Sequence, residues 1–523
     1  MSPGLVGCGI ISLALQALLL ASPAIAELTA QEKRGKVIYL QGETAAGAEI
    51  SALMGDAATE VPASVVPCGS CHGHDGRGRP EGGLYPSNLT WTALTKPYGL
   101  EHPGGRKHPP YTERTLKRAI TMGIDPAGNR LHMAMPRYQL THADAEDLVA
   151  YVRRLGEDLD PGLSDDTIRL ATLIPKDGPV ASLGAAIEAV LRARFDEVNR
   201  KGGIYHRRIE LAVVAGPQDA GERAAVFRQT LEAGETFALV GAFLPGAEAE
   251  LAAVAQELET PLIGPFTVHP QVDFFVPNPY VFYLLPGLED LGLSLVAFAA
   301  QRSGAEPPLA AVVRGNEARL DATTRGIVER GADLGWPAIR TAAVDDDSQI
   351  LALRDASVGR VFLLASGDRQ ATFFRRAAAL EWFPEVLLPG TLTGREIFQA
   401  AAGFADRLFV AYPTLPSSQD PRSVRDYREL AERYDLPSSH LAAQIATLGA
   451  AQVLIEGLKR TGRDLSRAAL VEALEGIVEL DTGLLPPVTY GPNRRVGIQG
   501  AYVVTVDLER QTLVPASGWV KSR

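Results

Sequence analysis

Apolar residues in the second two-thirds of the chain change repeatedly between two spacings. Short, nearly continuous apolar runs predict buried strands at 168–174, 209–214, 237–240 and 262–263. Apolar residues at helical spacing predict helices between those strands, at 183–198, 221–233 and 247–258. The same alternation restarts further on, with strands expected at 309–313, 361–365, 386–388 and 408–412. Apolar strands that alternate with helices predict parallel sheets covered on both faces, in two α/β lobes that follow one another.

The beginning of the chain carries a different pattern, with a helical segment at each end and a long stretch of loops between them. Thr29 and Glu32 form a capping box that opens the first helix. Thr141 opens the second, whose apolar stripe at helical spacing consists of Leu148, Tyr151, Val152 and Leu155. Gly35 leaves a gap on the first helix where an aromatic ring such as Tyr151 can pack. We therefore expect the two helices to cross there.

Residues 1–26 have the features of a secretory signal peptide. An apolar run over 10–20 is followed by a small-residue site, which predicts export to the periplasm with cleavage after Ala26. The run is too short to span a bilayer, and we find no later stretch of about twenty apolar residues. No Lys or Arg precedes the run, which departs from the usual signal. Residues 5–8 mimic a lipoprotein cleavage box that ends at Cys8, but they precede the apolar run, so lipidation there stays open.

Composition adds little to this division into domains, but it bears on which partners the protein can bind. We divide the chain into a signal peptide, a small domain, a short acidic linker and a two-lobed α/β domain, at 1–26, 27–158, 159–166 and 167–523. The net charge of −11 argues against nucleic acid as a partner, because proteins that bind it carry basic surfaces. Residues 27–162 contain 15 basic and 17 acidic side chains, whereas 163–523 contain 36 and 45, so most of the acidity lies in the second part.

The strongest chemical motif is Cys68-Gly69-Ser70-Cys71-His72. Two thiols three positions apart, followed at once by an imidazole, form the attachment site of a c-type haem. The thiols add to the two porphyrin vinyl groups, and the histidine binds the iron from one face. A redox dithiol or half of a zinc site are the alternatives, but no second cysteine pair completes a zinc site. Removal of the signal would leave Cys68 and Cys71 as the only cysteines, so we expect one covalent haem c.

The region 27–158 resembles the class I cytochromes c along its whole length: first helix, C-x-x-C-H motif, long loop, Met-Pro turn and last helix. This resemblance implies a small all-α fold. It also implies Met135 as the second axial ligand, because Met135, Pro136 and Tyr138 match the ligand loop of that family. A thioether opposite histidine favours electron transfer over oxygen chemistry. The alternative ligands are Met133, Met122, His74, His102, His108 and His132.

Two insertions depart from a minimal cytochrome. The segment 88–111 is rich in Pro, Gly and aromatic residues, and we expect it to pack over a face or edge of the haem. The alanine-rich segment 43–66 has no role that the sequence alone assigns.

The region 165–520 resembles the type I periplasmic solute-binding proteins, in the leucine/isoleucine/valine-receptor branch of the ABC transporter substrate-binding proteins. The likeness rests on a helix end with Asn199, Gly202 and Gly203, on the strand over 261–265, and on the terminal turn over 490–495. The resemblance implies a two-lobed α/β fold with a small-molecule ligand between the lobes, at the carboxyl ends of the strands.

The loops expected to line that ligand pocket depart from the family. We predict eight contact residues: Phe243, Leu244, Gly246, Phe266, Thr267, Ser366, Asp368 and Thr391. Aromatic and aliphatic side chains stand where the family commonly carries serines. The pocket is therefore predicted to suit an apolar or aromatic ligand better than a zwitterionic amino acid.

The sequence contains no serine-hydrolase, Walker or metalloprotease motif, so we do not expect an enzyme. The first interpretation is a periplasmic electron carrier joined to a small-molecule receptor, with a redox partner such as a dehydrogenase or an oxidase-linked carrier. The second is a solute receptor for a membrane transporter permease, in which the haem makes delivery redox-dependent.

Overall fold

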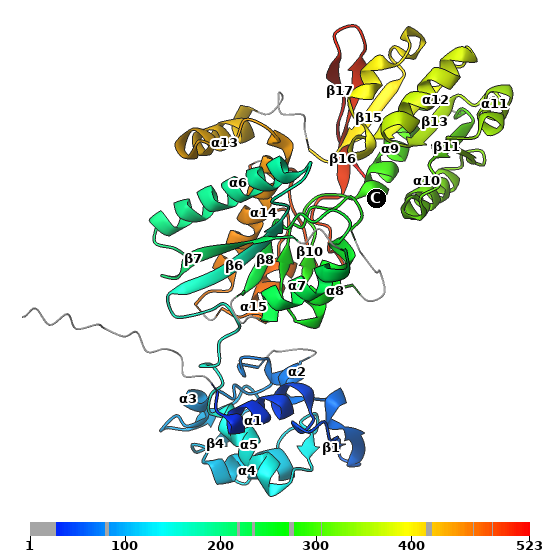
Figure 1. Ribbon diagram of the computed structural model, residues 1–523. Helices are drawn as coiled ribbons and strands as arrows, with labels where there is room; N and C mark the ends of the chain where they lie inside the picture. Colours follow the sequence, from blue (N-terminus) through cyan, green and yellow to red (C-terminus); the bar gives the residue numbers. More distant parts are fainter. Residues whose placement is uncertain are drawn as a thin grey trace, which may run out of the picture. The chain divides into compact units, whose positions relative to one another are not determined.

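The structure is a computed structural model that describes residues 28–78, 83–216, 220–232, 236–270, 277–304, 306–414, 421–463, 465–483 and 485–522. The chain divides into two compact units, Met1–Leu159 and Asp160–Arg523 (Figure 1). The predicted signal peptide, with Cys8 and the cleavage site after Ala26, lies outside the described residues.

The first unit is closed by its first and last long helices, α1 (Ala30–Gln41) and α5 (His142–Val152), which pack against each other (Figure 1). Both predicted N-termini are present. Thr29 accepts a hydrogen bond from the backbone of Glu32, and Thr141 caps α5 in the same way. These caps satisfy backbone N–H groups that the helices leave without partners.

The crossing of α1 and α5 requires Gly35. A Cβ at this position would overlap the carbonyl oxygen of Asp147 and crowd Tyr151, so the expected close packing is confirmed. Arg34 strengthens the crossing by donating to both carboxylate oxygens of Asp147, at 2.6 and 2.9 Å. Leu155, predicted on the same apolar stripe, lies just beyond the end of α5 and is buried there.

Among the described residues between the closing helices, three shorter helices and one 3-10 turn occur: η1 (Ala63–Val65), α2 (Cys68–His72), α3 (Trp91–Leu94) and α4 (Glu113–Met122). Thr112 caps α4, and Gly123 ends it in the left-handed conformation at φ 67°. Its buried face, formed by Leu116, Ala119 and Ile120, joins the core that α1 and α5 share.

Short strands add to this helical fold. The insertion 43–66 forms the hairpin β1 (Ser51–Met54) and β2 (Thr59–Pro62), and β1 also pairs with β5 (Arg137–Tyr138). The insertion is therefore tied to the segment that directly follows Met135. The second insertion contains a separate small hairpin, β3 (Leu100–Glu101) and β4 (Lys107–His108).

The described residues of the second unit form two sheets, one in each lobe. The first-lobe sheet is parallel throughout, in the order β10-β9-β8-β6-β7. Its strands are β6 (Thr167–Ile174), β7 (Arg208–Ala215), β8 (Ala238–Val240), β9 (Leu262–Ile263) and β10 (Val281–Phe282). Its helices are α6 (Ala181–Arg200), α7 (Ala220–Glu232), α8 (Glu248–Glu257), α13 (Pro421–Tyr434), α14 (Leu441–Arg460) and α15 (Arg467–Glu475).

Alternate residues of β6 show that both faces of this sheet are covered. Ile168 and Leu170 belong to a core shared with α6 and α14, whereas Ala171 and Leu173 belong to a core shared with α7 and α8. The predicted burial of the strands on both faces is confirmed.

The second-lobe sheet has the order β12-β11-β13-β14-β15-β16-β17. Its strands are β11 (Ala310–Arg314), β12 (Arg340–Ala343), β13 (Arg360–Leu364), β14 (Glu385–Pro389), β15 (Leu408–Tyr412), β16 (Gly500–Asp507) and β17 (Thr512–Lys521). Its helices are α9 (Leu288–Arg302), α10 (Asp321–Asp333), α11 (Asp347–Asp355) and α12 (Gly367–Ala379), with 3-10 turns η2 (Ala318–Leu320), η3 (Gly390–Leu392), η4 (Arg395–Gln399) and η5 (Ala402–Phe404).

Two features of the second unit correct the sequence expectation. The second-lobe sheet is mixed, because β16 pairs antiparallel with both β15 and β17. The lobes also do not follow one another along the chain: after β15 the helices α13–α15 return to the first-lobe core, and β16 then adds to the second sheet. The apolar pattern marks each element but not which sheet it joins.

Helix α14 is also a correction, because no apolar stretch of spanning length was expected after the signal. It is the one helix in the described part of the chain that is long and apolar enough to cross a membrane. In the structure, 72% of its most apolar 18-residue stretch is buried, and its side chains belong to the first-lobe core. This burial is that of a core helix.

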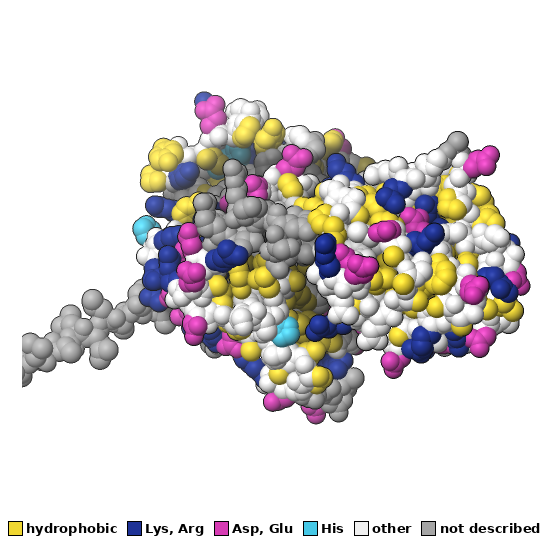
Figure 2. Space-filling view, turned by 90° about the horizontal axis from the view of Figure 1, so that it is seen from above, with side chains coloured by type: hydrophobic (Ala, Val, Ile, Leu, Met, Phe, Trp, Pro, Cys, Tyr) yellow, Lys and Arg dark blue, Asp and Glu magenta, His cyan; other side chains and the backbone are white. Residues whose placement is uncertain are grey.

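The surface agrees with the acidic composition. On the face shown in Figure 2, Lys and Arg side chains are interspersed with Asp and Glu side chains. This mixture of signs on the visible face accords with a net charge of −11.

Candidate haem site

The first unit encloses a cavity of about 530 Å³ beside the helix that carries the cysteine motif. Both thiols of the motif, the imidazole of His72 and the thioether of Met135 line it. Most of the remaining wall is apolar, with contributions from α1, α4 and α5 such as Tyr39, Leu116 and Leu148. The four residues predicted to hold the haem are therefore brought to one cavity.

Helix α2 places the motif on the wall. Cys68 and Cys71 lie three positions apart on a single helical turn, with Cys68 buried and Cys71 exposed. This spacing puts both thiols on the same side of the helix. Burial raises the pKa of the Cys68 thiol to about 11, so the sulfur is neutral rather than a reactive thiolate.

His72 is oriented by the loop that follows the motif. Its Nδ1 lies 2.8 Å from the carbonyl oxygen of Ser87, and because a carbonyl can only accept, Nδ1 carries the proton. The lone pair of the neutral ring is then on Nε2, which is the arrangement that a histidine ligand of a metal needs. Burial lowers the pKa of His72, which favours the neutral ring.

Two buried tyrosines hold the backbone on either side of the motif. Tyr138 donates its hydroxyl to the carbonyl oxygen of Val66 at 2.6 Å, and Tyr39 donates to the carbonyl oxygen of Gly73 at 2.8 Å. The first of these bonds comes from β5 and the second from α1. The ends of α2 are therefore fixed to two other elements of the domain.

Met135 is far from the cysteine motif in the sequence but lines the same cavity. A turn in which its backbone N–H donates to His132 O at 2.9 Å positions it just before β5, and its side chain packs partly buried against the domain core. The rival Met133 is 53% exposed and Met122 is 59% exposed, and neither belongs to the cavity lining.

One further thioether was missed by the sequence reasoning. Met54, at the end of β1, also lines the cavity. It comes from the insertion without an assigned role, and it reaches the site because β1 pairs with β5. Only that pairing, which the apolar pattern does not reveal, could have identified it.

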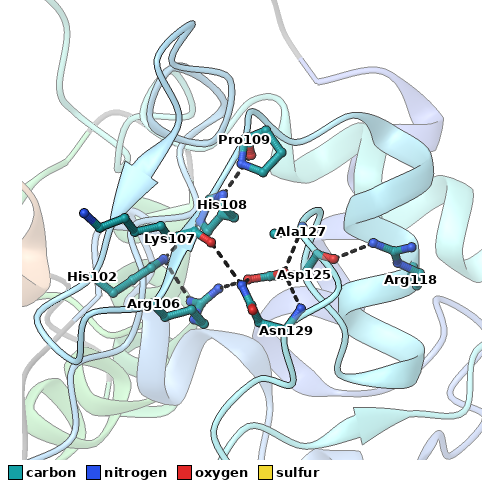
Figure 3. A network of polar contacts seen from close by, with 9 residues as sticks. All are labelled: His102, Arg106, Lys107, His108, Pro109, Arg118, Asp125, Ala127 and Asn129. Carbon is teal, nitrogen blue, oxygen red and sulfur yellow. Dashed lines mark hydrogen bonds and ion pairs between the residues drawn. The ribbon is translucent and has the colours of Figure 1, made fainter.

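Three of the four rival histidines also line the cavity: His102, His108 and His132. His102 and His108 belong to a polar network with Arg106 and Asp125 at one side of the wall (Figure 3). His74 is not part of the lining. Among the described residues, no group of three or more His, Cys, Asp or Glu side chains is placed to hold a metal ion.

The predicted receptor residues are distributed over both lobes. Phe243 and Phe266 follow β8 and β9, and their rings meet edge to face with centroids 6.0 Å apart. Leu244 is buried in the first-lobe core, so it supports the loop more than it faces a ligand. Thr267 accepts from the backbone N–H of His269 at 2.9 Å.

The other four predicted contacts are exposed: Gly246, Ser366, Asp368 and Thr391. The carbonyl oxygen of Gly246 accepts from the guanidinium of Arg223 at 3.1 Å. Ser366 precedes α12 and Thr391 lies in η3, so both are at carboxyl ends of second-lobe strands, as expected.

Two family profiles match the chain. The profile described as "Periplasmic binding protein" matches residues 167–512. The chain belongs to the periplasmic binding protein family. A second profile, described as "Cytochrome c", matches residues 63–156, which contain α2, Met135 and α5. This periplasmic binding protein thus carries a cytochrome c domain ahead of its receptor lobes, and that domain implies a haem cofactor.

Solved structures share the receptor fold. A fatty acid ABC transporter substrate-binding protein from Thermomonospora curvata is 18% identical, with 70% of this chain and 95% of that chain covered and a TM-score of 0.53. A branched chain amino acid ABC transporter from Thermus thermophilus with bound valine is 15% identical. The match covers 68% of this chain and 97% of that chain, with a TM-score of 0.54. A type 1 periplasmic binding protein from Bordetella pertussis is 16% identical. The match covers 68% of this chain and 100% of that chain, with a TM-score of 0.53. No curated protein matches the chain.

The cavity of this cytochrome c domain suits a porphyrin. It combines apolar walls with two neighbouring thiols, an imidazole whose lone-pair nitrogen is fixed by Ser87, and a thioether that also lines the cavity. Each of these groups is one that a c-type haem uses.

Proposed function

We propose that the protein is a periplasmic monohaem c-type cytochrome joined to a small-molecule receptor, and that it acts as a carrier rather than an enzyme. Cys68 and Cys71 form the thioether bonds, and His72 and Met135 are the axial ligands. The single observation that carries this proposal is the hydrogen bond from His72 Nδ1 to Ser87, because it leaves the Nε2 lone pair free to bind a metal.

The residues around the site support electron transfer. A haem with histidine and methionine ligands supplies a one-electron couple at raised potential. Met135 would supply the sixth ligand, and apolar residues such as Leu116 and Leu148 line the same cavity. A periplasmic dehydrogenase, or a carrier that serves an oxidase, is the proposed redox partner.

For the receptor lobes we propose an apolar or aromatic small molecule as ligand. The contact between Phe243 and Phe266 supports this choice, since two phenyl rings at the carboxyl ends of neighbouring strands favour an apolar group. The similar Thermomonospora curvata protein is a fatty acid ABC transporter substrate-binding protein, which is compatible with this choice, whereas the valine-bound Thermus thermophilus structure represents the amino acid alternative.

A difference spectrum of the exported full chain tests the cytochrome proposal. We expect a reduced-minus-oxidised spectrum with the α-band of a c-type haem, at one haem per chain, in a strain that can mature cytochromes c. The absence of that band under these conditions would contradict the proposal. N-terminal sequencing of the same sample tests export, with Glu27 expected as the first residue.

The second candidate function is solute delivery to a transporter permease, with a haem that makes binding redox-dependent. The match of the binding-protein profile to residues 167–512 favours it. Thermodynamic linkage requires that a ligand which shifts the haem potential binds with an affinity that depends equally on oxidation state. Calorimetry on the oxidised and reduced protein with leucine, phenylalanine and a fatty acid distinguishes the two, because a simple carrier shows equal affinities in both states.

A further inference from the structure

The hairpin β1–β2 is bonded to the segment that directly follows Met135. Strand β1 pairs antiparallel with β5, so that Leu53 lies opposite Arg137. The bonding continues one residue beyond β5, where the backbone N–H of Gln139 donates to the carbonyl oxygen of Ser51 at 2.8 Å. Because β5 begins two residues after Met135, this pairing constrains the loop that carries the proposed axial ligand.

The side chain of Arg137 makes a further connection to the hairpin. Its guanidinium donates to the carbonyl oxygen of Gly55, which follows β1 in the turn of the hairpin. Gly55 has φ 67°, a left-handed conformation that glycine adopts readily because it has no Cβ. The stem of Arg137 also packs at Gly123, the end of α4, where an added Cβ would lie 3.5 Å from it. Arg137 therefore joins the ligand loop to two separate elements.

The base of the hairpin is fixed in the core of the domain. Ile50, Ala52 and Ala63 are buried there. The backbone N–H of Ala63 donates to the carbonyl oxygen of Ile50 at 2.7 Å, which closes the hairpin at its base. Gly42, the C-cap of α1, approaches so closely that a Cβ there would lie 2.2 Å from the carbonyl oxygen of Ala63. The hairpin is therefore an anchored support for the segment bonded to it.

The loop around Met135 has little regular structure of its own. Between the end of α4 and the start of α5, the described residues contain a single strand, β5. Holding such a segment in one place costs conformational entropy, which the bonds to an anchored hairpin offset. These bonds fix the part of the loop beside Met135, whose thioether lines the cavity.

We propose that the hairpin β1–β2 is a clamp on the ligand loop, which holds Met135 in place against displacement by external ligands, and that Arg137 is its positioning residue. The proposal rests on the proposed function, because it needs Met135 as the axial ligand. It gives the insertion 43–66 a role. The cytochrome c profile matches from residue 63 onward, so both strands of the hairpin lie outside the matched part.

Displacement of Met135 is a ligand exchange. The bond between its sulfur and the iron breaks, and a bond between the iron and a nitrogen of the incoming ligand, such as imidazole, forms; no electron or proton is transferred. The incoming ligand can bind only while the loop is open, so the rate depends on how often the loop opens. Bonds that must break for opening lower the population of the open loop.

The test is stopped-flow binding of imidazole to the oxidised, haem-loaded full chain. Arg137→Gln removes a hydrogen bond from a charged donor, so we expect imidazole to bind about tenfold faster than in the wild type. Arg137→Lys keeps a cationic donor and should restore part of the slow rate. Arg153→Gln is the matched control, because that guanidinium pairs with Glu113 on α4 instead of with the hairpin, and its loss should leave the rate unchanged.

Gln139 provides a second test that leaves the guanidinium in place. Its side chain is exposed, while its backbone N–H belongs to the bonding with the hairpin. Gln139→Pro removes that N–H and should speed imidazole binding. Gln139→Ala keeps the N–H and should bind imidazole at the wild-type rate. This pair decides the question if Arg137→Gln fails to fold, and equal rates in the two variants would overturn the clamp.

The remaining outcomes separate the inference from the function on which it rests. A chain without haem overturns both. A haem-loaded chain in which Arg137→Gln binds imidazole at the wild-type rate, or no faster than Arg153→Gln, overturns the inference alone. If neither Arg137→Gln nor Gln139→Pro folds, hydrogen exchange of the wild type decides. Imidazole binds the open loop and must therefore speed exchange of the Gln139 amide, and an unchanged exchange rate contradicts the proposal.

Discussion

The side chains that line the cavity come from the cysteine motif, two insertions and the loop before α5, and they differ in their surroundings. The carbonyl oxygen of Ser87 fixes the tautomer of His72, whereas the Nε2 atoms of His102 and His108 lie 3.0 Å apart. The two thioethers on the wall, Met135 and Met54, differ in origin, since one belongs to the expected ligand loop and the other to an insertion. Single-residue variants can therefore test the proposed axial assignment.

Met135→Ala should abolish the weak methionine–iron charge-transfer band and lower the reduction potential, because a thioether ligand raises that potential. Met54→Ala should leave both unchanged. Absorption spectroscopy and redox titration of the two variants check this, with Met133→Ala as a second control at an exposed position. Loss of the band in Met54→Ala, with the band retained in Met135→Ala, would assign the ligand to β1 instead.

Removing Arg106 should destabilise the domain, because it leaves the fully buried carboxylate of Asp125 without its ion-pair partner. We expect Arg106→Ala to reduce the free energy of unfolding by about 3 kcal/mol. The neighbouring Lys107 pairs with Glu101 while both are mostly exposed, so Lys107→Ala should change it by about 0.5 kcal/mol or less. Urea unfolding of both variants measures the difference, and equal effects would show that the network contributes no specific stability.

At the scale of elements, the periodicity of apolar residues was sufficient to predict those helices and strands whose side chains pack at a fixed spacing. The closing helices, their caps and the contact at Gly35 were all predicted, as were the parallel strands of the receptor lobes. The hairpin β1–β2 was not, because its four-residue strands are too short to show a pattern. The partners Arg106 and Asp125 lie 19 residues apart in loops, where no periodicity relates them.

The helix crossing makes a direct prediction. Gly35→Ala should cost about 2 kcal/mol of unfolding free energy, since the added methyl group overlaps the backbone of α5. Gly104→Ala, in the β3–β4 hairpin, meets no atom within 4 Å and should be nearly neutral. Thermal or urea unfolding compares the two, and an undisturbed Gly35→Ala protein would contradict the close packing of α1 and α5.

At the scale of the whole molecule, the chain joins a small cytochrome c domain to a two-lobed binding protein. The order of the two was readable from the sequence, because one carries C-x-x-C-H and the other alternating strands and helices. The interleaving of the lobes could not be predicted, because the apolar patterns of α14 and β16 show that both are buried but not which lobe each one joins. The predicted aromatic ligand pocket depends on loops whose side-chain directions a sequence does not specify, as the buried Leu244 shows.

The central claim is that one haem is bound covalently by the two thiols of α2. Intact-mass measurement of the denatured, exported chain tests it most directly. We predict the mass of the processed polypeptide plus one haem for the wild type, and the mass of the polypeptide alone for the Cys68→Ala, Cys71→Ala double variant. A wild-type chain that loses its haem on denaturation, or a double variant that retains it, would contradict the account.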